Sequence, residues 1–217
     1  MIPIRDHNPS GKFPFITYLL IALNLVVFAV MFLASETAVE QLVVTYALIP
    51  DIVVTGQNLY TLLTSMFLHG GIAHVFGNML FLYIFGDNLE DYFGHLQFLF
   101  FYLFGGVIAA VLQVMVNPHS TVPVLGASGA IAAIMGGYLV LFPRHRVDVL
   151  FIFGWVVREA SVPAYTMLFY WFIFQLFSGV GSLAYLGQEV GGVAYFAHIG
   201  GFAFGWTATK LARKANR

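Results

Sequence analysis

The chain has 217 residues, of which 60% are hydrophobic, 17% are aromatic and only 9% are charged. A soluble domain carries about 25% charged residues, so this composition excludes a soluble globular protein and indicates a membrane protein with several spans. A formal net charge of −1 argues against a nucleic-acid partner. The absence of cysteine excludes thiol catalysis, disulfides and thiolate metal sites.

The few charged residues gather in clusters and leave long uncharged stretches between them. A membrane crossing takes about 20 residues, and the stretch 92–143 is long enough for two helices with a hinge at Asn117-Pro118-His119-Ser120. The sequence therefore predicts an all-α polytopic membrane protein, a single domain over residues 1–217 with a six-transmembrane-helix bundle. The helices are expected near residues 14–34, 71–86, 96–116, 126–142, 163–181 and 195–210.

Two features of the connections complete this expected topology. The apolar run from Val149 to Val157 lies between charged residues and is too short to cross a bilayer, so we interpret it as an interfacial segment. With six spans, all nine Lys and Arg residues fall on one side of the membrane. Cytoplasmic flanks collect basic residues, so both termini are expected in the cytoplasm. The first helix is expected to be retained, since the segment after Lys12 lacks a signal-peptide cleavage pattern.

Four polar residues fall inside the predicted helices at similar depths. His74 and Asn78 are four residues apart in the second helix and so share one face. Ser128 begins the fourth helix, and His198 lies near the outer start of the sixth. Taken alone, a serine between small residues usually packs between helices, and a lone asparagine usually bridges them. An intramembrane histidine more often faces a cavity or pathway, because an ionisable group is costly in the membrane.

Together these four residues supply the parts of an acyl-transfer site. Such a site needs a nucleophile, a base within hydrogen-bond reach and donors aimed at the developing oxyanion. Ser128 can attack a carbonyl, and neutral His198 can take its proton and return it to the leaving amine. His74, Asn78 and the backbone N–H of Ser128 can donate to the oxyanion, the last because the first N–H groups of a helix lack intrahelical partners. The combination predicts a Ser-His protease dyad.

Three short segments, in order on the expected helices, carry a resemblance to a known family. They are Phe67-Leu68-His69-Gly70-Gly71 followed by His74-Val75-Phe76-Gly77-Asn78-Met79, then Gly126-Ala127-Ser128-Gly129, and then Ala197-His198 followed by Gly201 and Gly205. With the six-helix order, these segments make the chain similar to the rhomboid family of intramembrane serine proteases from about residue 14 to 210.

The resemblance implies a role for each of these residues. Ser128 would be the nucleophile and His198 the general base and acid, while His74 and Asn78 would form the oxyanion site with the Ser128 N–H. It also implies that the fourth helix begins below the outer surface, at the base of a water-filled cavity. Five further residues are expected to be structural: Gly126, Gly129, Gly201, Gly205 and Glu90. Glycines spaced by four in the sixth helix would let it pack closely on the fourth.

By the same resemblance, the substrates are single-span membrane proteins cut near the outer end of their helix. Helix-weak residues there would lower the cost of exposing a peptide bond. The expected partners are therefore transmembrane substrates and the lipid bilayer, in a prokaryotic cell (inner) membrane. Access between the second and fifth helices would suit such a substrate, and the aromatic segment from Tyr165 to Phe177 is either a gate or a stripe that faces lipid or packs on other helices. No motif supports a metal, nucleotide or redox cofactor, and none is expected.

The chain departs from the family pattern at two places. Many members carry an aromatic residue four positions after the nucleophile, where its ring packs on the catalytic histidine, but this chain has Ala132. The candidates to orient His198 instead are Tyr138, Phe196 and Phe202. In the first outer loop, a Trp-Arg pair of many bacterial members is replaced by Tyr60-Thr61, so the loop must be anchored differently.

Two other classes of function compete with an active protease. A catalytically inactive relative would bind or chaperone membrane clients, but it would be expected to have lost Ser128 or His198, and both are present. A transporter or channel could also use buried His, Ser and Asn residues, but it would be expected to carry a charge or repeat signal that this sequence lacks.

Overall fold

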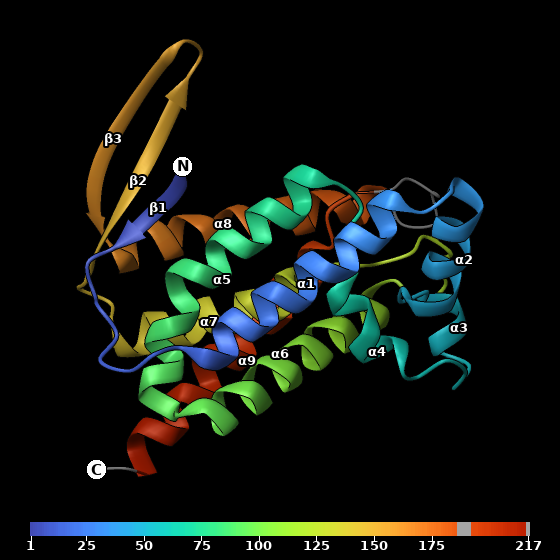
Figure 1. Ribbon diagram of the computed structural model, residues 1–217, viewed down its shortest axis with the longest axis horizontal. Helices are drawn as coiled ribbons and strands as arrows, with labels where there is room; N and C mark the ends of the chain where they lie inside the picture. The colour runs from blue at the N-terminus through green and yellow to red at the C-terminus, as the bar shows by residue number, and fades with distance from the viewer. Residues whose placement is uncertain (186–191, 216–217) are drawn as a thin grey trace.

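The computed structural model describes residues 1–185 and 192–215 of the chain (Figure 1). Figure 1 shows the long helices side by side in one bundle, with short helices gathered at one end and a β-hairpin rising from the other. The described elements, in chain order, are β1 (Ile2–Asp6), α1 (Phe15–Leu33), α2 (Glu36–Tyr46), α3 (Pro50–Val53), α4 (Thr61–Thr64), the 3-10 turn η1 (Ser65–Phe67), α5 (Ile72–Phe93), α6 (His95–Val116), α7 (Ser128–Leu141), β2 (Arg146–Phe153), β3 (Val156–Pro163), α8 (Ala164–Ser182), the 3-10 turn η2 (Leu183–Tyr185) and α9 (Tyr195–Ala215).

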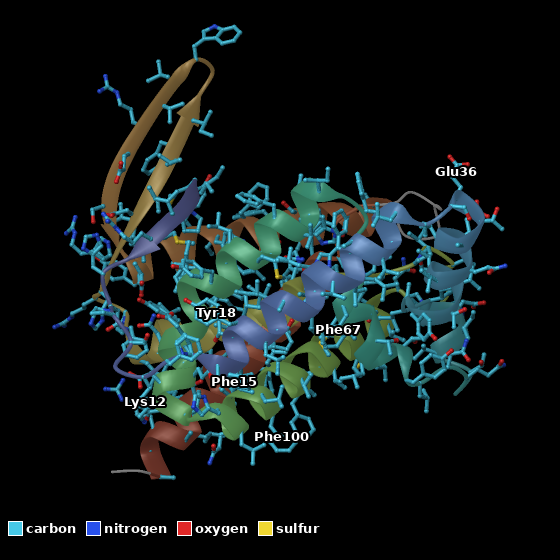
Figure 2. All side chains as sticks on the ribbon, in the orientation of Figure 1. Lys12, Phe15, Tyr18, Glu36, Phe67 and Phe100 are labelled. Carbon is cyan, nitrogen blue, oxygen red and sulfur yellow. The ribbon has the colours of Figure 1, made fainter. Side chains whose placement is uncertain are left out.

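The helices divide by length and hydropathy. Among the described residues, α1, α6 and α8 are long and apolar enough to cross a bilayer, and α5 makes a fourth when it is counted with the bent segment Thr61–Phe67 before it. The chain is therefore an integral membrane protein built as a mostly helical bundle. We call the end where α1 begins and α9 ends the basal end, and the end where α7 and α9 begin the apical end. Figure 2 shows Lys12 and Glu36 at opposite ends of α1, the first basal and the second apical.

α7 is the central helix of the bundle. It has 14 residues, so it is about 21 Å long and shorter than the roughly 30 Å hydrocarbon core of a bilayer. Every residue from Gly129 to Tyr138 is buried, because neighbouring helices surround the helix. Its N-terminus therefore lies inside the bundle and below the apical loops.

The packing of α7 on α9 depends on glycines, which have no side chain to separate the two helices. A Cβ at Gly201 would overlap the carbonyl oxygen of Gly129, and a Cβ at Gly205 would overlap that of Ala133. From the other helix, a Cβ at Gly136 would overlap the carbonyl oxygen of Phe202. The two backbones are thus in direct contact over more than one turn, as small residues allow in membrane helices. This contact fixes the start of α7 relative to the start of α9.

The apical connection between α1 and α5 contains short helices where a loop was expected. α2, α3, α4 and η1 occupy much of residues 36–67. An isolated bridge between Leu48 and Val124 ties this connection to the segment before α7. The hydroxyl of Tyr60 donates to the carbonyl oxygen of Thr45 at 2.9 Å, and that of Thr61 donates to Asn58 at 2.7 Å. These bonds anchor the connection at the positions where the Trp-Arg pair is missing.

α5 continues well past residue 86, where the second helix was expected to end. Charged residues after Gly86 interrupt the apolar stretch of the sequence, but Asn88 and Glu90 are buried and hydrogen-bonded within the bundle. The helix stops at Phe93 because Gly94 has a φ of 80°, a left-handed conformation that favours glycine. Buried hydrogen bonds thus keep the charged segment in the bundle, and Gly94 sets the end of the helix.

The prediction of an all-α chain was wrong at the basal end, where three strands form an antiparallel sheet in the order β1-β2-β3. The segment interpreted as interfacial lies in the hairpin, in which β2 pairs with β3 from Arg146 opposite Pro163 to Phe153 opposite Val156. Val147 and Val149 point into the core, and β-branched residues favour such half-buried strands. Trp155 at the turn is fully exposed.

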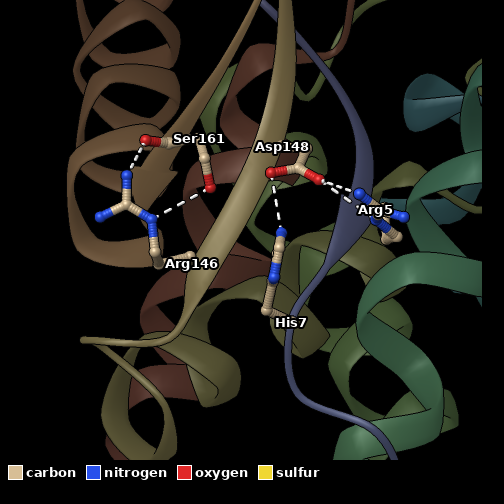
Figure 3. Close-up of polar contacts among 5 residues, drawn as sticks. All are labelled: Arg5, His7, Arg146, Asp148 and Ser161. Carbon is tan, nitrogen blue, oxygen red and sulfur yellow. Dashed lines mark hydrogen bonds and ion pairs between the residues drawn. The ribbon is translucent and has the colours of Figure 1, made fainter.

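Hydrogen bonds to one carboxylate tie the first strand to the hairpin (Figure 3). Asp148 is 4% exposed and accepts bonds from Arg5 Nη2 at 2.6 Å and from His7 Nε2 at 2.8 Å. The hydrogen bonds from Arg5 hold the pKa of the Asp148 carboxyl well below its usual range. Toward the neighbouring strand β3, the Arg146 guanidinium donates to the hydroxyl and the carbonyl oxygen of Ser161.

Two further carboxylates bind the basal ends of the helices together. Glu90 is 1% exposed and accepts bonds from the backbone N–H groups of Ile16 and Thr17 and from the Thr17 hydroxyl, each at 2.7 Å. It therefore satisfies the first turn of α1, where N–H groups lack intrahelical partners. Asp6 accepts from the Tyr138 hydroxyl of α7 at 2.8 Å, and burial raises the pKa of its carboxyl to about 6.

Candidate active site

A cavity of about 880 Å³ opens near the apical starts of α7 and α9. All four residues predicted as catalytic or oxyanion residues line it: His74 and Asn78 from α5, Ser128 from α7 and His198 from α9. The residues are far apart in the sequence and meet because α7 lies between α5 and α9 in the bundle. None of the described residues that line the cavity is Asp, Glu, Lys or Arg. The site is therefore polar without a fixed charge.

Ser128 and His198 are in hydrogen-bond contact. The distance from Ser128 Oγ to His198 Nε2 is 2.7 Å, which is typical of a strong bond. Ser128 is the first residue of α7, so its side chain lies at the open end of the helix and is partly exposed. His198 stands in the first turn of α9 and is only 9% exposed. The close α7–α9 packing below them holds the two side chains at this separation.

The second ring nitrogen of His198 contacts α8. Its Nδ1 lies 2.8 Å from Oε1 of Gln175, a residue that is 5% exposed. The indole of Trp171, one turn earlier on α8, lies with its centroid 5.7 Å from that of the imidazole, at an interplanar angle of 35°. The sequence did not single out these two residues. A signal was available, because Gln175 is the one amide side chain of a mostly apolar helix.

The three residues expected to replace the missing aromatic lie in different places. Tyr138 lies at the basal end, where its hydroxyl donates to Asp6. Phe202 stacks on Phe172 of α8 with a centroid distance of 4.5 Å, and Phe196 lines the cavity. Ala132, the position of the missing ring, is buried against Gly201 of α9. A larger side chain at that position would push the two helices apart.

Asn78 and His74 form the other wall of the site. Asn78 is 8% exposed, and its side-chain nitrogen donates to Nε2 of His69 at 2.9 Å. The ring of His69 in turn meets the ring of His74 edge to face, with centroids 5.0 Å apart. His69 belongs to the first quoted motif, but the sequence assigned it no role. In the fold it holds Asn78 and packs on His74.

Gly126 brings the backbone before Ser128 close to His74. Its φ of 119° lies in the left-handed region, and a Cβ there would lie 2.6 Å from His74 Nε2. The backbone N–H of Gly126 donates to the carbonyl oxygen of Ser65 at 2.9 Å, which holds the segment against η1. The other predicted structural residues, Gly129, Gly201, Gly205 and Glu90, lie in the helix contacts described above. The arrangement thus combines a serine hydroxyl, an imidazole and nearby hydrogen-bond donors in one cavity, which are the groups that acyl transfer uses.

Comparison with known proteins agrees with this arrangement. A family model described as the Rhomboid domain matches residues 56–215. The Rhomboid protease GluP of Bacillus subtilis (strain 168) is 31% identical over 137 residues, which are 63% of this chain and 26% of the relative. RHOMBOID-like protein 6, mitochondrial, of Arabidopsis thaliana is 30% identical over 154 residues, 71% of this chain and 44% of the relative. Rhomboid protein 1, mitochondrial, of Saccharomyces cerevisiae (strain ATCC 204508 / S288c) is 27% identical over 212 residues, 92% and 55% of the two chains.

The chain spans roughly a quarter to a half of the lengths of these relatives. Their names include mitochondrial proteins beside a bacterial one, so the expectation of a prokaryotic cell membrane finds no support in them. The matched family domain covers most of the bundle, from the apical connection through α9, and includes every residue of the candidate site. This chain belongs to the rhomboid family.

Proposed function

We propose that the chain is an intramembrane serine endopeptidase that cleaves membrane-protein substrates with Ser128 and His198. The observation that carries the proposal is the 2.7 Å contact between Ser128 Oγ and His198 Nε2, inside an uncharged cavity between membrane helices. A serine hydroxyl is a weak nucleophile until an adjacent base takes its proton. A neutral imidazole at this distance is such a base.

The reaction would proceed in two steps. Ser128 Oγ attacks the carbonyl carbon of the scissile bond while His198 Nε2 takes the hydroxyl proton. The protonated imidazole then gives that proton to the leaving amine, and an acyl-enzyme remains. A water molecule, deprotonated by the same nitrogen, hydrolyses the ester and restores Ser128. The cavity gives water a route to the ester, since the polar loop residues Asn117 and Ser120 also line it.

Three donors are assigned to the oxyanion. They are the side chains of His74 and Asn78 and the backbone N–H of Ser128, which lies in the first turn of α7. One N–H of the Asn78 amide goes to His69, so the other is the one assigned to the substrate. A donor held in place before the reaction stabilises the developing charge most, and loss of one such donor costs about 100-fold to 1,000-fold in kcat.

The proposed topology has six crossings, made by α1, α5, α6, α7, α8 and α9, and places both termini on the cytoplasmic side. The basal end carries most of the basic residues, as the cytoplasmic side of a membrane protein does. The cavity would then face the opposite side. The substrates would be single-span proteins cut near the outer end of their helix, where helix-weak residues make a peptide bond accessible.

The proposal is tested with the purified full chain in liposomes that contain a labelled single-span substrate. We expect cleavage by the wild type and a loss of more than about 1,000-fold in Ser128→Ala and in His198→Ala, with unchanged thermal unfolding. Ser161→Ala and His119→Ala are matched controls outside the cavity and should cleave like the wild type. A serine-directed fluorophosphonate should label the wild type but not Ser128→Ala.

Cleavage that survives Ser128→Ala would contradict the proposal and indicate a contaminating protease. A folded wild type that neither cleaves a panel of substrates nor reacts with the fluorophosphonate would contradict it as well. That result would favour a protein that binds membrane clients without cutting them.

A further inference from the structure

The geometry points to Gln175 as a positioning residue that fixes the tautomer of His198 and makes catalysis depend on the position of α8. This inference rests on the proposed function, because it concerns how the base is held ready. It replaces the expected aromatic contact with a hydrogen bond from a different helix. The proposed unit is therefore Ser128, His198 and Gln175, contributed by α7, α9 and α8.

The chemistry of the two contacts selects one tautomer. Gln175 Oε1 is a carbonyl oxygen and can only accept, so the hydrogen between it and His198 must reside on Nδ1. A neutral imidazole carries one N–H, and Nε2 is then an unprotonated acceptor that faces Ser128 Oγ. The opposite tautomer would leave Nε2 with a hydrogen and unable to take the serine proton. Gln175 thus selects the form of His198 that can act as a base.

Burial makes this selection strong. Gln175 and His198 are 5% and 9% exposed, so water cannot readily replace either partner. A buried polar group left without a partner loses its hydration and gains no hydrogen bond in return, so the paired arrangement is favoured. The bond also persists when His198 is protonated during the reaction, because Nδ1 donates in the imidazolium too. Because an amide is neutral, Gln175 can accept this bond without placing a charge on α8 beside the imidazolium that forms during the reaction.

The contact belongs to one continuous face of α8. Trp171, Gln175 and Gly179 are spaced by four residues and therefore share a side of the helix. This side meets α9: Trp171 packs on His198 and Phe202, and a Cβ at Gly179 would lie 3.2 Å from the Ile199 side chain.

The opposite side of α8 is different. There the rings of Tyr170, Phe174 and Phe177 are exposed, which agrees with a lipid-facing stripe. If α8 moved outward to admit a substrate, Oε1 would leave Nδ1 and His198 would lose its fixed tautomer. The base is thus ready only while α8 is seated on α9.

The test compares Gln175→Met with Gln175→Glu and uses Gln113→Met as the control. Methionine keeps the length of glutamine but removes the oxygen acceptor, whereas glutamate keeps an acceptor. Gln113 on α6 also contacts the start of α9, where its Oε1 accepts from the backbone N–H of Ala197 at 3.2 Å. Gln113→Met therefore makes the same chemical change beside His198 without touching the imidazole.

The decisive readout is the tautomer of His198, measured by 15N NMR of histidine-labelled full chain and assigned with His198→Ala. We expect a single Nδ1–H form of neutral His198 in the wild type and in Gln113→Met. We expect the same form in Gln175→Glu, where Nε2 should gain a proton only at low pH. In Gln175→Met we expect a mixture of tautomers. In the cleavage assay, kcat should fall about tenfold to 100-fold in Gln175→Met with KM within about twofold, and Gln175→Glu should recover most of the loss.

An Nε2–H tautomer in the wild type overturns the inference, and so does a single Nδ1–H form in Gln175→Met. If Gln175→Met does not fold, an Nε2–H tautomer in the wild-type spectrum still overturns the inference. The NMR measurement needs no substrate, so it tests the positioning role of Gln175 separately from the proposed protease function. An Nδ1–H signal that changes only in Gln175→Met supports the positioning role even if the wild type proves unable to cleave, which would contradict only the proposed function.

Discussion

The apical and basal ends of this bundle solve the problem of buried polar groups in different ways. At the apical end, Ser128, His198 and Gln175 are joined by hydrogen bonds between uncharged groups, and Asn78 is hydrogen-bonded to His69 on the other wall of the cavity. At the basal end, carboxylates accept several hydrogen bonds each, and Asp148 also pairs with Arg5.

The function proposed for the apical site accounts for the difference. A site within the membrane needs groups that stay neutral and free to move a proton, since an isolated charge there is costly. The basal carboxylates join segments that are distant in the sequence, and their charge strengthens those bonds. We therefore expect changes to the apical groups to alter catalysis and changes to the basal groups to alter stability. Three predictions test this division.

The largest effect on stability is expected for Glu90→Ala. The change leaves three buried donors at the start of α1 without their acceptor, and we expect a loss of about 4 kcal/mol in the free energy of unfolding. Thermal unfolding in detergent measures it, with the exposed Glu40→Ala as control. The turnover of each folded molecule should be unchanged. A Glu90→Ala variant that unfolds like the wild type but does not cleave would contradict the assignment of stability to the basal groups and catalysis to the apical groups.

Gly201→Ala should affect both properties, because it lies in the α7–α9 contact close to the dyad. Its Cβ would overlap the carbonyl oxygen of Gly129, which adjoins Ser128. We expect a loss of about 3 kcal/mol from overpacking and a more than tenfold fall in kcat. Gly181→Ala, where a Cβ meets nothing within 4 Å, is the control. Unchanged cleavage in Gly201→Ala would mean that the dyad tolerates a shift of α9.

The smallest effect is a pH dependence of opposite sign at two neighbouring carboxylates. The pKa of Asp6 is raised to about 6 by burial, so the folded chain holds this proton more tightly than the unfolded chain. Stability should therefore fall by about 1 kcal/mol as the pH rises from about 4 to about 6, after allowance for solvent screening. Asp6→Asn should remove this slope, because an amide oxygen can still accept from Tyr138.

Asp148 should behave in the opposite way. Hydrogen bonds from Arg5 lower the pKa of its carboxyl, so the stability that it contributes is present above pH 4 and is lost as the pH falls below its ordinary value. Asp148→Asn should lose that contribution at neutral pH and flatten the acid limb of the curve. Unfolding midpoints of the wild type and both variants between pH 3 and pH 8 measure the two slopes. Slopes of the same sign would contradict the assigned environments.

Some parts of the structure could be predicted because they depend on local composition. The long apolar helices α1, α6 and α8 follow from uncharged stretches of sufficient length. The motifs around Ser128 and His198 indicated a serine and a histidine at similar depths, and their side chains lie 2.7 Å apart. The small residues of the sixth expected helix indicated close packing, which Gly201 and Gly205 make with α7.

Other parts of the structure depend on which strands pair and on which side of a helix faces its neighbour. Strand β1 joins β2 across more than 140 residues, as the bond from Arg5 to Asp148 illustrates, so no local pattern marks it as part of a sheet. The partner of His198 depends on which side of α8 faces α9. Hydropathy does not reveal that rotation, because both sides of α8 carry aromatic residues.

Composition and short motifs are properties of the chain alone, so they suffice to identify a membrane protein of the rhomboid family and the residues that are candidates for its chemistry. The folded structure was needed to find that Gln175 contacts His198, that His69 holds Asn78, and that the N-terminal strand completes a basal sheet. These contacts range from nine residues apart in the sequence, for His69 and Asn78, to more than 140, for β1 and β2. Their geometry is set by backbone packing, above all where the glycines of α9 meet α7.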